Sequence, residues 1–258
     1  MPTRESNQTT PAGSDADSTE GTDGDAPDPD EILVALLEGN DSHVDGLPGD
    51  YFDPVREEQH PDVVTICCAD SRVSQEGMWA VDRPGAVFTP SNIGNQAWDD
   101  HEGEKIVDGS LLYPVYYADT DAIAIVGHTG CGAVTAAYDV ANGNEPPGPA
   151  GVSKWVEMLV PVIEDGLESD LIDADAERPI VINQLVEYNV DRQAAFLHAA
   201  ETVPDSVAIY GFVYDFHGVY GSDAGRAHLV NLNGETSPEN IIDQLPDAYA
   251  KNVGSLLY

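Results

Sequence analysis

Short, continuous apolar runs alternate along the chain with longer stretches of helical periodicity. The runs are VVTICC (63–68), AIAIVGH (122–128), VAIYGFVYD (207–215) and RAHLVNLN (226–233), and all are rich in β-branched or aromatic residues. Runs of this length and composition are typical of strands buried in a sheet. The sequence therefore predicts strands at these places, and a further strand in AVFTPSNIGN (86–95).

The stretches between the apolar runs have the spacing of helices. The clearest helix spans 180–200, where apolar residues repeat along one stripe: Val186, Val190, Ala194 and Leu197. A short helix is expected at 30–39, with Asp30 as its N-cap and Gly39 as its end. Further helices are expected at 73–81, 102–118, 132–143, 151–166 and 238–245.

Strands that alternate with helices predict an α/β fold, a mainly parallel sheet flanked by helices. Residues 1–30 contain almost nothing apolar and are expected to form a disordered acidic tail. Residues 31–258 are expected to form a single domain. Ligands bind such sheets at the carboxyl ends of the strands, so these ends are where candidate chemistry is expected.

Two strand ends carry residues that bind metals. The first strand runs into Cys67-Cys68-Ala69-Asp70-Ser71-Arg72, and side chains two apart on a strand face the same way. If the extended geometry persists, Cys68, Asp70 and Arg72 point together and Cys67 points elsewhere, as an inert core thiol. The second strand ends in His128, with Cys131 three residues later. Two cysteines and one histidine at neighbouring strand ends predict a three-ligand metal site with one open position.

Zinc fits this set of ligands, since it accepts thiolates and imidazole in tetrahedral geometry. An open fourth position can hold water whose pKa falls to about 7, which makes hydroxide available near neutral pH. Gly127, Gly130 and Gly132 are expected to let the backbone turn sharply and approach a small ligand. A helix that begins near Gly132 would point its N-terminal amides at the site and favour thiolate at Cys131.

Asp70 has alternative roles. Its free carboxylate could occupy the fourth zinc position and block catalysis. Paired with Arg72, it would instead stay ionised, turn away from the metal and accept a hydrogen bond from zinc-bound hydroxide. The pair could also serve only to stabilise the fold. We favour the orienting role.

The two motifs together resemble those of the β-class carbonic anhydrases. CADSR (68–72), GHTGCG (127–132), PGAVF (84–88) and NIGN (92–95) are each similar to family segments and occur in the same order. The resemblance covers roughly residues 31–232. It implies a zinc enzyme that interconverts carbon dioxide and bicarbonate, built as a homodimer or a multiple of dimers.

The resemblance also implies a substrate pocket, and two branches of the family differ there. The plant-like, open-site branch has residues that match Gln59, Phe88, Ile93 and Tyr113, and Gly132 is assigned to substrate binding beside them. The bicarbonate-inhibited branch has a tryptophan and an arginine where this chain has Thr65 and Ser91, although Tyr214 matches its tyrosine. The sequence therefore resembles the plant-like branch.

Other functions stay open at this point. Some proteins with this fold hydrolyse a linear analogue of carbon dioxide, such as carbon disulfide or carbonyl sulfide, and narrowing of the entrance would distinguish them. A non-catalytic zinc-binding protein would hold the metal without hydrating carbon dioxide. The other histidines of the chain follow no ligand spacing.

The net charge of the chain indicates which partners and which cellular environment to expect. The chain has 47 acidic and 10 basic residues, a net charge of −37, of which −7 lies in residues 1–30 and −30 in the rest. Such a surface disfavours nucleic acid and anionic membranes as partners. Three cysteines do not suggest a disulfide framework, and no hydrophobic signal region stands at the N-terminus. We expect a cytoplasmic protein from a halophile, whose cytoplasm is concentrated salt.

This charge predicts that folding and activity rise steeply towards molar salt. Self-repulsion acts over about 10 Å at 0.1 M salt but only about 3 Å at 1 M salt, so added salt removes most of the destabilisation. Circular dichroism across a potassium chloride series measures the effect. A stable fold in dilute buffer would contradict adaptation to a saline cytoplasm.

Overall fold

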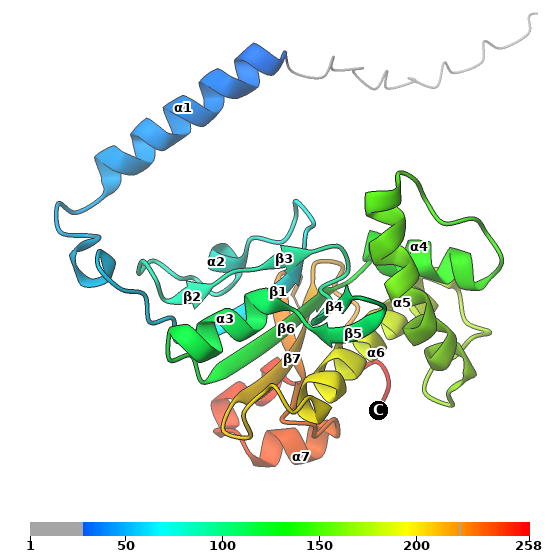
Figure 1. The fold of residues 1–258 in the computed structure, drawn as a ribbon. Helices are drawn as coiled ribbons and strands as arrows, with labels where there is room; N and C mark the ends of the chain where they lie inside the picture. Colours follow the sequence, from blue (N-terminus) through cyan, green and yellow to red (C-terminus); the bar gives the residue numbers. More distant parts are fainter. Residues whose placement is uncertain (1–27, 222) are drawn as a thin grey trace, which may run out of the picture. The chain divides into compact units, whose positions relative to one another are not determined.

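A computed structural model describes residues 28–221 and 223–258 (Figure 1). The chain divides into residues 1–50 and residues 51–258, and each part is described by itself. Most of the expected disordered tail, residues 1–27, lies outside the described residues. A single domain from residue 31 onward stays a prediction.

The described residues of the first part form one helix, α1 (Pro29–Gly46). Its N-cap is Asp28, whose carboxylate accepts a hydrogen bond from the Asp30 amide at 2.8 Å, so the predicted N-cap at Asp30 was wrong. The predicted end at Gly39 was also wrong, because one glycine inside an exposed helix costs only about 1 kcal/mol. Every residue of α1 is exposed, including Leu36 and Leu37.

The second part is built on a sheet in the order β2-β1-β6-β7-β8, with β3 also paired to β1. All of its pairings are parallel except that of β7 with β8, which confirms the predicted mainly parallel sheet. Its strands are β1 (Val63–Cys68), β2 (Val87–Phe88), β3 (Ser91–Asn92), β6 (Ala122–His128), β7 (Ala208–Asp215) and β8 (Arg226–Leu232).

Strand β6 lies at the centre of this sheet, and its neighbours are β1 and β7. Cys67 pairs with Val126, and His128 pairs with Tyr214, so the three strands end close together. Ile66, Ile123 and Ile125 are fully buried, as continuous apolar runs predict. The register thus places the carboxyl ends of β1, β6 and β7 side by side.

Long helices pack beside the sheet: α4 (Gly132–Ala141), α5 (Ala150–Glu168) and α6 (Arg178–Ala199). In Figure 1, α4 and α5 lie side by side, and α6 runs against the strands. A Cβ on Gly127 or Gly211 would come within 3 Å of the Val190 side chain. These glycines therefore let α6 approach β6 and β7 closely. Short helices are also present: α2 (Gln75–Met78), α7 (Pro238–Asp243), η1 (Asp53–Val55) and η2 (Asp247–Asn252).

The predicted helix over 102–118 was wrong in its first part. Residues 98–107 form an antiparallel hairpin of β4 (Trp98–His101) and β5 (Glu104–Val107), and α3 spans only Gly109–Tyr117. Glu102 and Gly103 join the strands with φ of 55° and 86°, the left-handed geometry of a tight hairpin turn. Likewise, the strand expected over 86–95 is reduced to the two-residue strands β2 and β3.

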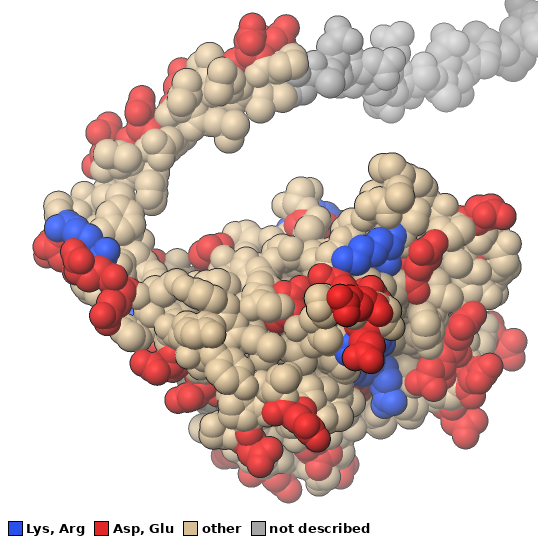
Figure 2. Space-filling view, in the orientation of Figure 1, with Lys and Arg blue, Asp and Glu red and all other residues tan. Residues whose placement is uncertain are grey.

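Acidic side chains spread over the face of residues 51–258 seen in Figure 2, with few basic ones among them. The charge of the chain thus lies on the folded surface as well as in its N-terminal residues. In the described part of the chain, no helix is both long enough and apolar enough to cross a bilayer.

Candidate metal centre

Three ligand-bearing residues meet at the carboxyl ends of β1 and β6. Cys68 is the last residue of β1, His128 is the last residue of β6, and Cys131 is the N-cap residue of α4. Their ligand atoms all lie within 4.8 Å of one another, and all three residues are buried. The structure therefore brings together the three residues that the sequence predicts as metal ligands.

The imidazole of His128 is oriented for ligation. Its Nδ1 lies 3.1 Å from the backbone oxygen of Thr129. Because this oxygen can only accept a hydrogen bond, Nδ1 must carry the ring proton and donate it. Its Nε2 is buried and has no hydrogen-bond partner among the described residues, and His128 offers a ligand atom within 4.8 Å of those of the two cysteines. A buried nitrogen lone pair left unpartnered is costly unless something binds it, so this atom fits a metal.

The sulfur atoms of Cys68 and Cys131 lie 3.8 Å apart. Two sulfurs that each sit about 2.3 Å from a tetrahedral zinc ion are separated by about 3.8 Å, so the spacing fits zinc. Without a metal, the hydrogen bond from Cys131 lowers the pKa of Cys68 to about 5. The same contact, together with burial, raises the pKa of Cys131. A dication between the two sulfurs would favour the thiolate form of both cysteines.

Asp70 and Arg72 form a pair beside these ligands, although the strand does not continue to reach them. β1 ends at Cys68, and the Val73 amide donates to the Asp70 backbone oxygen in a turn. The Asp70 carboxylate accepts from the Arg72 amide and Nε, both at 2.9 Å, and from its guanidinium nitrogen at 2.7 Å. These bonds lower the pKa of Asp70.

The paired carboxylate lies close to the ligands without touching them. Asp70 Oδ2 is 3.6 Å from Nε2 of His128, which is beyond hydrogen-bonding distance. Three bonds from Arg72 hold the carboxylate in this position. Arg72 thus favours the ionised form of Asp70, and its role in keeping Asp70 off a bound metal stays a prediction.

Cys67 does not belong to this group. It is fully buried, and burial raises the pKa of its thiol well above the usual range. Its side chain leaves β1 on the opposite face from Cys68, as alternation predicts. It is therefore a core thiol.

A loop after β7 also reaches the ligands, and our sequence analysis missed it. The Thr129 hydroxyl accepts from the Phe216 amide at 3.3 Å and is hydrogen-bonded to Nδ1 of His217 at 2.7 Å. The Phe216 ring stacks on His128. The signal was available, because the end of a strand parallel to β6 must lie beside the end of β6.

Residues assigned to the substrate pocket lie in several elements. Phe88 on β2 and Tyr113 on α3 have ring centroids 6.2 Å apart. Ile93 is half-buried against the core, and Gln59 is exposed on the loop before β1. Gly132 is the first residue of α4, with open space where a Cβ would be.

The three glycines of the second motif do not share one role. Gly130 has a φ of +63°, so it makes the sharp turn that was expected. Gly127 instead lies against Val186 and Val190 of α6. Its missing side chain makes room for a helix, and its approach to a ligand stays a prediction.

The positions that distinguish the bicarbonate-inhibited branch are joined by a buried glutamine. The Thr65 hydroxyl donates to Oε1 of Gln75. Nε2 of Gln75 donates to the Ser91 hydroxyl at 2.9 Å and to the backbone oxygen of Pro90 at 3.0 Å. Thr65 and Ser91 are thus bonded within the protein.

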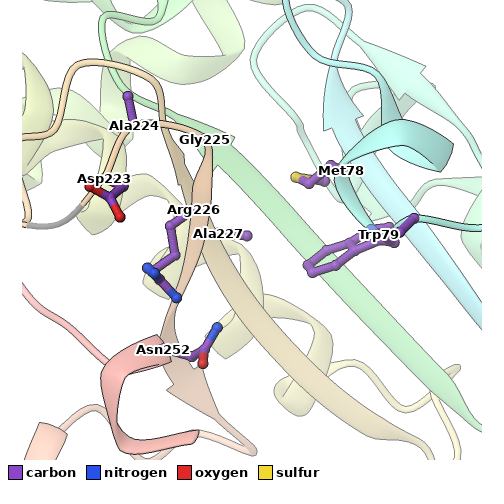
Figure 3. Close-up of a pocket in the computed structure, with 9 residues that line it drawn as sticks. Met78, Trp79, Asp223, Ala224, Gly225, Arg226, Ala227 and Asn252 are labelled. Carbon is purple, nitrogen blue, oxygen red and sulfur yellow. The ribbon is translucent and has the colours of Figure 1, made fainter.

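A separate hollow of about 400 Å³ lies near the start of β8. Met78 and Trp79 lie on one side of it, and Arg226 and Asn252 on the other (Figure 3). None of its lining residues belongs to the Cys–His–Cys group or to the Asp70–Arg72 pair. The candidate centre is therefore defined by its ligands and not by this hollow.

Comparison with known proteins agrees with this geometry. The family model described as carbonic anhydrase matches residues 63–220, which include every residue of the Cys–His–Cys group and the Asp70–Arg72 pair. The chain therefore belongs to the carbonic anhydrase family.

Individual relatives support the same assignment. Carbonic anhydrase 2 of Mycobacterium tuberculosis is 29% identical over 211 residues, which cover 78% of this chain and 94% of the relative. A carbonic anhydrase of Emericella nidulans is 28% identical, over 73% of this chain and 77% of that protein.

Solved structures show that the fold is that of the β class. A β-carbonic anhydrase of Sordaria macrospora matches with a TM-score of 0.63 at 20% identity, over 78% of this chain and 98% of that one. The Coccomyxa β-carbonic anhydrase matches with a TM-score of 0.62 at 24% identity, over 84% and 92%.

We predict that Cys68→Ser and Cys131→Ser each lose zinc, whereas Cys67→Ser retains it. Both thiolates are needed to balance the dication, while Cys67 faces the core. Metal analysis of the three purified variants by mass spectrometry, with the fold checked by circular dichroism, measures this. A folded Cys67→Ser protein without zinc would contradict the ligand assignment.

Proposed function

We propose that this protein catalyses the reversible hydration of carbon dioxide to bicarbonate and a proton, with zinc held by Cys68, His128 and Cys131. The observation that carries this proposal is the convergence of two thiols and an unpartnered imidazole nitrogen beside a carboxylate fixed by an arginine. Membership of the carbonic anhydrase family supports the reaction.

Cys68, His128 and Cys131 would hold the zinc, which would lower the pKa of a water at its open position to about 7 and supply hydroxide near neutral pH. The protein supplies the geometry. The Thr129 backbone oxygen orients His128, and the α4 amides near Cys131 favour its thiolate. Two negative sulfurs cancel the charge of the ion.

Asp70 is the proposed orienting residue, with Arg72 as its partner. Its carboxylate lies next to the point where the three ligands converge, at 3.6 Å from Nε2 of His128. An ionised carboxylate there would accept a hydrogen bond from the water or hydroxide that reacts with carbon dioxide, and would so orient it. Arg72 holds two sides of the carboxylate, which prevents Asp70 from turning onto the metal.

We assign the substrate pocket to Gln59, Phe88, Ile93, Tyr113 and Gly132, as in the plant-like branch. Apolar side chains suit a linear, uncharged substrate, and the half-buried Phe88 and Ile93 supply them. The Thr65 and Ser91 hydroxyls are both hydrogen-bonded to Gln75. This supports the same branch, because the bicarbonate-inhibited branch has a tryptophan and an arginine at these two positions.

Stopped-flow carbon dioxide hydration in molar salt tests this function. We expect turnover by the wild-type enzyme and a loss of roughly tenfold or more in Arg72→Ala, with zinc retained, because Asp70 is then free to bind the metal. Normal turnover in Arg72→Ala would make the pair merely structural. Hydrolysis of carbon disulfide or carbonyl sulfide without hydration would identify the hydrolase instead. Zinc without either activity would identify a non-catalytic protein.

We also propose that the active form is a homodimer or a multiple of dimers in which α1 packs on a second copy. Apolar residues on α1 are 46–67% exposed, and an isolated helix that exposes them is unstable in water. The residues concerned are Ile32, Leu33, Val34, Leu36, Leu37 and Val44. The similar Sordaria macrospora enzymes are described as tetrameric.

Truncation distinguishes the helix from the residues before it. Deletion of 1–46 should give inactive monomers, whereas deletion of 1–27, which keeps α1 and its cap, should change neither assembly nor activity. Gln59 is exposed in the single chain, and we propose that it reaches the pocket of the second copy and donates its amide to the substrate there, so that the site is shared. Gln59→Ala should then keep zinc and the dimer but weaken substrate handling by about 1–3 kcal/mol, the cost of that one hydrogen bond. Light scattering and the hydration assay in molar salt measure these. A fully active monomer without residues 1–46 would refute a shared site.

The charge of −37 supports a further proposal, that the protein works in a saline cytoplasm. Three lysines in 258 residues leave few positive charges to offset the carboxylates, so counterions from the solvent must screen them.

A further inference from the structure

One aromatic ring touches both halves of the site. Phe216 lies parallel to the His128 imidazole within 30°, with ring centroids 5.3 Å apart. The guanidinium carbon of Arg72 lies over the same ring, 4.6 Å from its centroid. Phe216 is thus in contact with a metal ligand and with the residue that holds Asp70.

The backbone around Phe216 is fixed from both sides. Asp215, which is fully buried, accepts hydrogen bonds from the amides of His217 at 3.0 Å, Gly218 at 2.8 Å and Tyr220 at 3.0 Å. Thr129 bonds the Phe216 amide and the His217 ring. The backbone that carries the Phe216 ring is therefore held by Thr129, the neighbour of His128, and by Asp215 at the end of β7.

Arg72 needs such support, because its side chain is 51% exposed. The bonds to Asp70 fix the two side chains relative to each other, but they leave the pair free to move as a unit. Contact with an aromatic face favours a guanidinium and orients its plane. Among the described residues, Phe216 is the ring that holds Arg72 against the β6 side of the site.

We propose that Phe216 is a positioning residue of this enzyme, whose ring aligns the Arg72–Asp70 pair with the His128 ligand. The inference rests on the proposed function for its catalytic consequence. Its structural part does not, because the placing of Arg72 can be measured in the metal-free protein. The proposed role predicts that loss of the Phe216 ring makes Arg72 more mobile and lowers kcat. KM should change little, because the contacts with the substrate are untouched.

Three variants test this. Phe216→Leu removes the ring, Phe216→Tyr keeps it, and Phe212→Leu is the matched control. Phe212 lies on β7, just before the loop that carries Phe216, but it packs edge-on against Trp79, at a centroid distance of 5.0 Å. We expect kcat to fall about three- to tenfold in Phe216→Leu, the size of one cation–aromatic contact, with zinc retained. Phe216→Tyr and Phe212→Leu should keep wild-type kcat.

A spectroscopic measurement separates positioning from general damage. In metal-free protein, the Arg72 Nε proton should be shifted upfield by the ring current of Phe216, and Arg72→Lys identifies its signal. The shift should persist in Phe216→Tyr and Phe212→Leu and vanish in Phe216→Leu. In an Arg72→Ala background, Phe216→Leu should have no further effect on kcat.

An unmoved Arg72 signal in Phe216→Leu, or an equal loss of kcat in Phe212→Leu, would overturn the proposal. If Phe216→Leu does not fold, Phe216→Met, which keeps most of the volume without a ring, takes its place in both measurements. A wild-type enzyme without hydration activity would refute the proposed function, while the proton signal would still decide the position of Arg72.

Discussion

The parallel pairing of β1 with β6 is the interaction on which the site depends. It brings Cys68 level with the end of β6, and the turn after β6 then returns Cys131 to within 3.8 Å of the Cys68 sulfur. Pairing of β6 with β7 adds the loop that carries Phe216. Gly127 and Gly211 let α6 pack directly on these strands. Backbone register, more than any single side chain, therefore sets the geometry of the ligands.

Much of this arrangement could be predicted from the sequence. Continuous apolar runs identify β1 and β6, and ligand-type residues at their ends identify Cys68, His128 and Cys131. Alternation along β1 separates Cys68 from Cys67, which the structure places in the core. These inferences succeed because strand burial and side-chain alternation are local properties that a short window of sequence expresses.

Other features depend on interactions that a local pattern does not contain. Residues 102–107 have a helical composition, yet Glu102 and Gly103 adopt left-handed geometry and form a hairpin. Gly39 would end many helices, but it lies inside α1. The contact of Phe216 with Arg72 joins residues 144 positions apart, and only the order of strands in the sheet brings them together. Predicting it would have required the position of β7 beside β6.

The short distances between Asp70 and Arg72 decide how this pair responds to salt in an enzyme so rich in carboxylates. Concentrated salt screens the repulsion between carboxylates on the surface, but it also screens the attraction between opposite charges that lie apart. At 1 M salt the screening length is about 3 Å. The bonds between Arg72 and the Asp70 carboxylate measure 2.7–2.9 Å, so no ion fits between the partners. The salt concentration that we propose for its surroundings would therefore leave this contact in place.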